Sequence, residues 1–208
     1  MSPRTEALWA KQNQHDDDRL RLFRTVARFV DVTTVLYPGS YVDISPSMVF
    51  PSVTYVDVDD RARRFFGDVA GVRTILARYA DAPGEPEFSF VHADYTTELP
   101  IAHQSYDLLV SLFAGFVSEH CAHHLQVGGI LLANASHGDA AMASIDRRFA
   151  LSGVVESVSG DYRIRTDHLD TYMIPKRPID VTVDLLHQTG RAIAYTSSPF
   201  AYVFTRVQ

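Results

Sequence analysis

Short apolar runs typical of β-strands alternate with helical segments along most of this sequence. The strand-like runs, in chain order, are "TTVLY", "SVTYVDV", "FSFVHAD", "SYDLLVSL" and "GGILLANA". Helices are expected between them, including over residues 116–127 and 138–153. Strands that alternate with helices imply right-handed crossovers and a mainly parallel sheet covered on both faces. The pattern therefore predicts a doubly wound α/β domain.

The two ends of the chain depart from this alternation. Residues 1–30 are predicted to be a helical segment packed on the domain, because apolar residues recur at three and four positions from Leu20 onward. Residues 31–208 are predicted to form a single domain. Within it we expect an inserted hairpin at about 154–176 and a final, antiparallel strand in "FAYVFTRV". The hairpin is a candidate edge for a homodimer.

Composition and charge argue against several classes of protein. The 208 residues are 46% hydrophobic, enough for a globular core, and the net charge is -6 with the basic residues scattered. A nucleic-acid partner needs a clustered basic face and is not expected. The apolar runs fall short of the roughly 20 residues that span a bilayer, and the N-terminus is too polar for a secretory signal. With one cysteine, Cys121, the sequence predicts a cytoplasmic protein that acts on a small molecule or a protein.

One glycine and several polar residues follow the predicted strands at their carboxyl ends, where open α/β sheets bind ligands. Gly39 allows a tight turn after the first strand, and Asp57 ends the second, where a carboxylate can accept both hydroxyls of a ribose. Asp94 after the third strand is placed to accept a hydrogen bond from an adenine amino group. Ser111 and Asn134 end the next two strands. The spacing of the acids suits an adenosine ligand.

Each of these positions also has an ordinary structural explanation. Gly39 fits any strand-to-helix turn, and Asp94 fits a turn-forming aspartate. Asp59 competes with Asp57 for the ribose, although capping the next helix explains Asp59 as well. Asp43 is explained equally well by capping the turn that follows it, in which Ser45 is a predicted N-cap. The residues alone leave these alternatives open.

The middle of the sequence resembles the class I S-adenosylmethionine-dependent methyltransferases, which have a Rossmann-like fold. The resemblance runs from about residue 30 to the end and rests on "VLYPGS", "VTYVDVDD", "FVHADYTTELP", "SYDLLVSL" and "HLQVGGILLANAS". It implies that Gly39 is the first glycine of the cofactor loop, that Asp57 is the ribose acid and that Asp94 lies beside the adenine. It places Ser111 at the rim near the reacting methyl group. S-adenosylmethionine is then the implied cofactor, and a small molecule the implied methyl acceptor.

The cofactor loop departs from the family pattern. Where the family has G-x-G-x-G, this sequence reads Gly39-Ser40-Tyr41-Val42-Asp43, and Tyr37 stands where an acid usually precedes the loop. Asp43 is the candidate to replace that acid, with Tyr37 and Ser40 also in the predicted cofactor site. The alternative is a non-catalytic domain of this fold that binds a nucleotide-type ligand or a protein partner.

Two histidine-containing segments suggest further chemistry. In "ASHGD", His137 follows the fifth strand and is a candidate general base, with Asn134 as a substrate-orienting group; the alternative is a loop in which Asp139 caps the next helix. In "EHCAHH", nitrogen and sulfur side chains suggest zinc. On a helix, however, His120 and His124 would share a face that Cys121 does not. We therefore predict no metal site.

Overall fold

The computed structural model describes residues 2–15, 17–79 and 84–208. The chain divides into two compact units, residues 1–99 and 100–208, and each is described by itself. Both units combine strands with helices, which confirms the predicted α/β, Rossmann-like class with an antiparallel last strand. In the described part of the chain, no helix is both long and apolar enough to cross a membrane.

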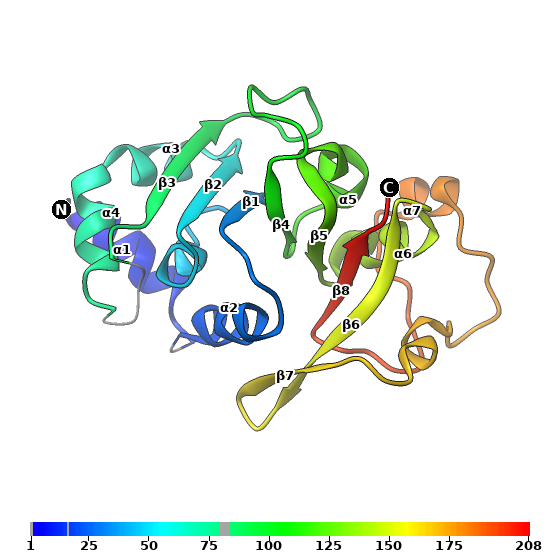
Figure 1. The fold of residues 1–208 in the computed structure, drawn as a ribbon. Helices are drawn as coiled ribbons and strands as arrows, with labels where there is room; N and C mark the ends of the chain where they lie inside the picture. The colour runs from blue at the N-terminus through cyan, green and yellow to red at the C-terminus, as the bar shows by residue number, and fades with distance from the viewer. Residues whose placement is uncertain (1, 16, 80–83) are drawn as a thin grey trace. The chain divides into compact units, whose positions relative to one another are not determined.

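The first unit contains three parallel strands in the order β3-β2-β1, with four helices (Figure 1). Its elements are α1 (Pro3–Gln12), α2 (Asp18–Phe29), β1 (Thr34–Pro38), β2 (Ser52–Asp57), α3 (Asp60–Gly67), α4 (Val69–Leu76) and β3 (Glu87–His92). The register sets Tyr37 opposite Tyr55 and Asp57 opposite His92. The loops that follow these strands therefore emerge at one edge of the sheet.

Apolar residues of α2 and β1 build the core of the first unit. The predicted stripe of α2 is buried at Leu20, Phe23 and Val26, and Phe23 packs edge-on against Tyr37 of β1. The N-terminal helix α1 is attached through Asp68, which accepts a hydrogen bond from the Thr5 hydroxyl at 2.7 Å. The two helices thus fill most of the predicted N-terminal helical segment.

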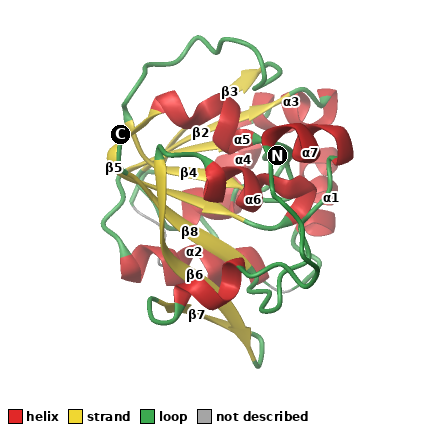
Figure 2. Ribbon diagram, turned by 90° about the vertical axis from the view of Figure 1, so that its right-hand side faces the viewer, coloured by secondary structure: helices red, strands yellow, loops and turns green. Residues whose placement is uncertain are grey.

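The second unit has its strands in the order β4-β5-β8-β6-β7, with β4 and β5 parallel and the others antiparallel (Figure 1). Its elements are β4 (Tyr106–Ser111), α5 (Val117–Cys121), β5 (Leu125–Ala133), α6 (Asp139–Ile145), β6 (Phe149–Val158), β7 (Asp161–Arg165), α7 (Val183–Thr189) and β8 (Ala201–Arg206). Helix α6 packs against β6 and β8, and α7 packs against α6 (Figure 2). The strand β8 is the predicted antiparallel last strand.

Two predicted helices are much shorter than expected. The segment 116–127 forms the five-residue α5 and a 3-10 turn, Ala122–His124, before β5 begins at Leu125. Helix α6 ends at Ile145, because Asp146 leaves the helical conformation and accepts hydrogen bonds from the backbone and guanidinium of Arg148. The hairpin β6–β7 therefore begins at Phe149, earlier than predicted.

Candidate functional site

The loop after β1 has an unusual backbone. Gly39 has φ +67° and donates its N–H to the Val56 carbonyl at 2.8 Å. Two residues later, Tyr41 also lies in the left-handed region at φ +48°, where residues with a side chain are uncommon. Between them, the Ser40 side chain is 2% exposed, and its hydroxyl has no hydrogen-bond partner among the described residues. The loop thus contains a buried hydroxyl that is unsatisfied among the described residues.

Asp57 at the end of β2 holds this loop. Its carboxylate accepts the Tyr41 N–H through one oxygen and the Asp59 N–H through the other, each at 2.7 Å. A carboxylate has about four acceptor positions, so two of them stay available. The half-buried Asp57 therefore joins the loops after β1 and β2 and retains capacity to bind hydroxyl groups.

Asp43 and Tyr37 contact each other in the interior of the first unit. Asp43 is 1% exposed and accepts hydrogen bonds from the Tyr37 hydroxyl at 3.2 Å and the Ser45 N–H at 3.1 Å. Burial raises the pKa of Asp43, although the Arg19 guanidinium, 4.0 Å away, opposes the shift. The predicted N-cap is displaced, since Ile44 is the N-cap of the 3-10 turn Ser45–Met48. Asp43 thus supports the loop from inside.

Asp59 and Arg61 lie beside the loop. Asp59 caps α3, as predicted, by accepting the Arg61 N–H at 2.6 Å. Hydrogen bonds from the Arg61 side chain are the main reason that the pKa of Asp59 is lowered to about 2. The same guanidinium lies 5.2 Å from the centre of the Tyr41 ring. Asp59 is thus committed to the helix end, which leaves Asp57 as the better candidate for a ligand.

A cavity of about 480 Å³ adjoins Tyr41 and Arg61 within the first unit. This volume lies in the range of small-molecule sites, about 300–1,000 Å³. The lining residues are mostly polar, and three of them, Lys11, Arg19 and Arg61, are cations. The others are Gln12, Asn13, Gln14, His15, Asp18 and Tyr41. The N-terminal helices therefore supply most of one wall of a cavity beside the candidate cofactor loop.

Asp94 is exposed and organises a turn after β3. Its carboxylate accepts the backbone N–H of Thr96 at 2.9 Å and the Thr96 hydroxyl at 2.8 Å. The Asp94 carbonyl accepts the Thr97 N–H at 3.0 Å. These contacts are those of the turn-forming aspartate that the sequence left as an alternative.

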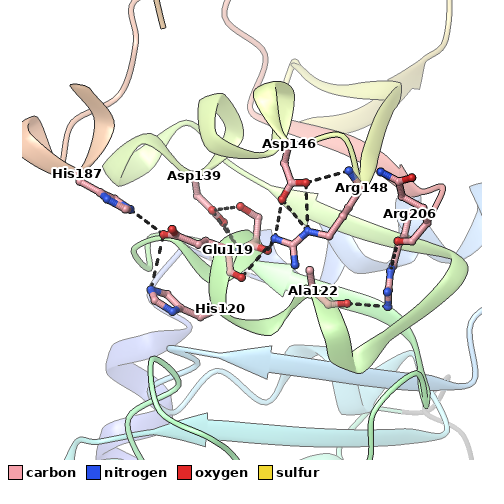
Figure 3. A network of polar contacts seen from close by, with 10 residues as sticks. Glu119, His120, Ala122, Asp139, Asp146, Arg148, His187 and Arg206 are labelled. Atoms are coloured by element: carbon pink, nitrogen blue, oxygen red, sulfur yellow. Dashed lines mark hydrogen bonds and ion pairs between the residues drawn. The ribbon is translucent and has the colours of Figure 1, made fainter. Parts of the chain in front are cut away.

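In the second unit, Ser111 is bonded to a buried carboxylate. The Ser111 hydroxyl donates to Asp139, which also accepts the Ser118 hydroxyl at 2.5 Å and the Ser118 N–H at 3.1 Å. Asp139 thus caps the N-terminal end of α5, although it lies far from α5 along the chain. Burial raises the pKa of Asp139 to about 6, although the serine hydrogen bonds oppose the shift. Figure 3 shows Asp139 within the polar network of this region.

Asn134 and His137 follow β5 in the same unit. The buried Asn134 side chain accepts the backbone N–H groups of Phe113 and Ser136, each at 3.2 Å. It therefore fixes the loop after β4 against the loop after β5. His137 is exposed, with a left-handed backbone at φ +56°. Its side chain lies on the surface, available to a substrate.

The comparison with solved structures agrees with the α/β fold described above. No family model matches the sequence, and neither does any curated protein. Among solved structures, the cofactor-bound protein Rv0187 from MTB is 12% identical, with 79% of this chain and 88% of that chain covered and a TM-score of 0.52. The O-methyltransferase from Bacillus cereus in complex with SAH is 10% identical, with 79% and 89% covered and a TM-score of 0.50. The chain shares the Rossmann-like fold of these solved structures.

The polar network of the second unit includes contacts that the sequence did not predict. Glu119 of α5 accepts a hydrogen bond from His187 of α7 at 2.8 Å, and Arg148 donates to the Glu119 carbonyl at 3.4 Å (Figure 3). Ser118 and Asp139 are separated by a whole strand, so no local spacing indicates their contact. Asp146 and Arg148 are close in sequence, so theirs is the contact of this network that local spacing could indicate.

Proposed function

We propose that this protein transfers the methyl group of S-adenosylmethionine to a small-molecule acceptor. The observation that carries the proposal is the loop after β1, whose left-handed Gly39 and Tyr41 lie next to the acid at the end of β2. An acidic side chain at that point is suited to the hydroxyls of a ribose. The methyltransferase fold supports this use of the strand ends.

The residues of the first unit fit such a cofactor. Asp57 has free acceptor positions for ribose hydroxyls, and the exposed Asp94 after β3 is the proposed residue on the adenine side. The buried Ser40 hydroxyl has no partner among the described residues, and an unsatisfied buried group costs about 1–3 kcal/mol, so a ligand that bonds to it relieves that cost. Gly39 gives the tight turn, while Tyr37 and Asp43 support the loop from beneath.

Reactivity in this proposal comes mainly from orientation. When bound, S-adenosylmethionine supplies an electrophilic methyl group on a sulfonium sulfur. The protein has to hold the acceptor in line with that group, which by itself can account for several kcal/mol of the barrier. The cavity beside Tyr41 has a suitable size for a small acceptor. In the second unit, His137 is the proposed general base, while Asn134 and Ser111 position the loops around it.

Calorimetric titration of the full chain with S-adenosylmethionine, and separately with S-adenosylhomocysteine, tests the proposal. We expect both to bind. Asp57→Ala and Asp57→Asn should weaken binding at least about tenfold, or about 1.4 kcal/mol, because both remove the charge that the ribose hydroxyls contact. The asparagine variant keeps an oxygen that can accept the Tyr41 N–H, so it separates loss of the ligand contact from loss of the loop.

Asp60→Asn is the matched control. Asp60 lies at the first turn of α3 with its side chain 57% exposed, so its removal should change the affinity by less than about twofold. Absence of binding by either ligand at millimolar concentration contradicts the proposed function. Binding that Asp57→Asn leaves unchanged rejects the ribose role of Asp57 but retains the cofactor.

A further inference from the structure

Three histidines of the second unit converge at the amino ends of two parallel strands. His103 precedes β4, and His123 and His124 precede β5. One ligand nitrogen from each lies within 4.8 Å of the others. The ring centres of His123 and His124 are 3.9 Å apart, and that of His103 lies 4.7 Å from His123. This cluster lies at the edge opposite the carboxyl ends of β4 and β5, away from Ser111 and Asn134.

Backbone hydrogen bonds bring these residues together. The Gln104 N–H donates to the His123 carbonyl, and the Ser105 N–H donates to the His124 carbonyl, each at 3.0 Å. These two hydrogen bonds fasten the segment before β4 to the turn before β5. Because the arrangement is preformed, binding a ligand there orders little further chain.

The ring of His124 is already oriented as a ligand. Its side chain is 1% exposed, and its Nδ1 lies 3.1 Å from the Ala102 carbonyl oxygen. A carbonyl only accepts, so Nδ1 carries the proton and Nε2 presents a lone pair. Metal-binding histidines are commonly held in this way by a backbone carbonyl on the other ring nitrogen.

We propose that His103, His123 and His124 bind a divalent transition-metal ion such as Zn²⁺. Imidazole nitrogen suits zinc at about 2.0–2.1 Å, and three histidines are a known ligand set that leaves a fourth position for water. The exposed His103 is the ring that closes on the other two. A site here would stabilise the turn between α5 and β5, a role separate from methyl transfer.

The sequence alone predicts no metal site in this segment. On a continuous helix, His120 and His124 would share a face that Cys121 does not. The helix actually ends at Cys121, and Cys121 is buried in the core. His120 contacts Glu119 at 3.8 Å, and His103 joins the cluster from a separate segment.

Titration of the metal-free, untagged full chain with ZnCl₂ in the calorimeter tests the site. We expect one Zn²⁺ per chain. His103→Ala and His123→Ala should each weaken Zn²⁺ binding at least about tenfold, since each removes one of three ligands. Loss of a residue that merely supports a ligand already weakens metal binding by about that factor. Both positions are partly or fully exposed, and unfolding curves recorded without zinc verify that each variant folds.

His120→Ala is the matched control from the same "EHCAHH" segment and should keep the wild-type affinity for Zn²⁺. An affinity that His103→Ala leaves unchanged overturns the proposal. So does an equal loss in His120→Ala, because it would indicate general binding to surface histidines. Zinc should also raise the midpoint of thermal unfolding of the wild type more than that of His103→Ala.

Discussion

At the residue scale, the backbone of the loop after β1 explains how two glycines of the family pattern can be missing. Tyr41 stands at the first of the two missing glycines and yet has φ +48°, in the region that glycine adopts most readily. The hydrogen bond from its N–H to Asp57 and the Arg61 guanidinium over its ring hold it there. Tyr41 therefore adopts the left-handed conformation although it is not glycine.

The same reasoning predicts that Gly39 is needed for stability as well as for binding. Gly39→Ala places a side chain at φ +67°, which costs about 1–2 kcal/mol for a residue with a Cβ. We expect the free energy of unfolding, measured with urea, to fall by that amount. Gly67→Ala is the control, because a Cβ there meets no atom within 4 Å and alanine is favoured at a helix end. Equal effects of the two substitutions would argue against strain at Gly39.

At the element scale, the sequence indicates strands well and helix ends poorly. Each predicted strand-like run from β1 to β5 contains a strand. The continuous apolar runs predicted to be buried form β1 and β4, since a parallel strand covered on both faces demands such residues. Helices α5 and α6 stop early for reasons that periodicity does not contain. The contact that caps α5 comes from Asp139, which is far along the chain, and α6 is ended by the local pair Asp146 and Arg148.

The residues of the candidate site also differ in how well the sequence predicts their placement. Gly39 and Asp57 could be found from the sequence because position at a strand end defines them. The interior placement of Asp43 and the serine partners of Asp139 could not, since both depend on packing between segments distant in sequence. The histidine cluster likewise needs His103, which no spacing connects to His123.

The Asp139 cap predicts a pH dependence of stability. Its folded-state pKa of about 6 lies above the ordinary value of 3.8 for an aspartate, so the folded protein binds the proton more tightly than the unfolded chain. The stability that comes from protonated Asp139 is therefore fully present below pH 3.8 and is lost as the pH rises through 6. The free energy of unfolding falls by about 3 kcal/mol over that range. Asp139→Asn carries no charge and should lack this loss. Urea unfolding between pH 4 and pH 7, at constant ionic strength, measures the difference.

Asp161→Asn serves as the charge-matched control, because Asp161 is exposed at the start of β7. It removes one carboxylate without touching the buried network. If Asp139→Asn follows the wild-type profile across this pH range, the carboxylate of Asp139 ionises in the folded protein as it does in the unfolded chain, and burial does not control it.

At the scale of the whole molecule, the cofactor residues and the buried Asp139 network belong to different compact units. Gly39 and Asp57 lie in residues 1–99, and Asp139 lies in residues 100–208. The sole tryptophan, Trp9, is buried in the first unit, so its fluorescence reports on that unit alone. Far-ultraviolet circular dichroism reports on both. The two signals together can therefore locate the effect of a ligand.

We predict that S-adenosylhomocysteine moves the Trp9 unfolding transition to higher urea. A ligand that binds only the folded state at a hundredfold its dissociation constant adds about 2.7 kcal/mol to the free energy of unfolding. Asp57→Asn at the same ligand concentration should show a smaller shift, because its affinity is lower. If calorimetry detects binding while the Trp9 transition does not move, the ligand binds outside residues 1–99, and the assignment of the loop after β1 fails.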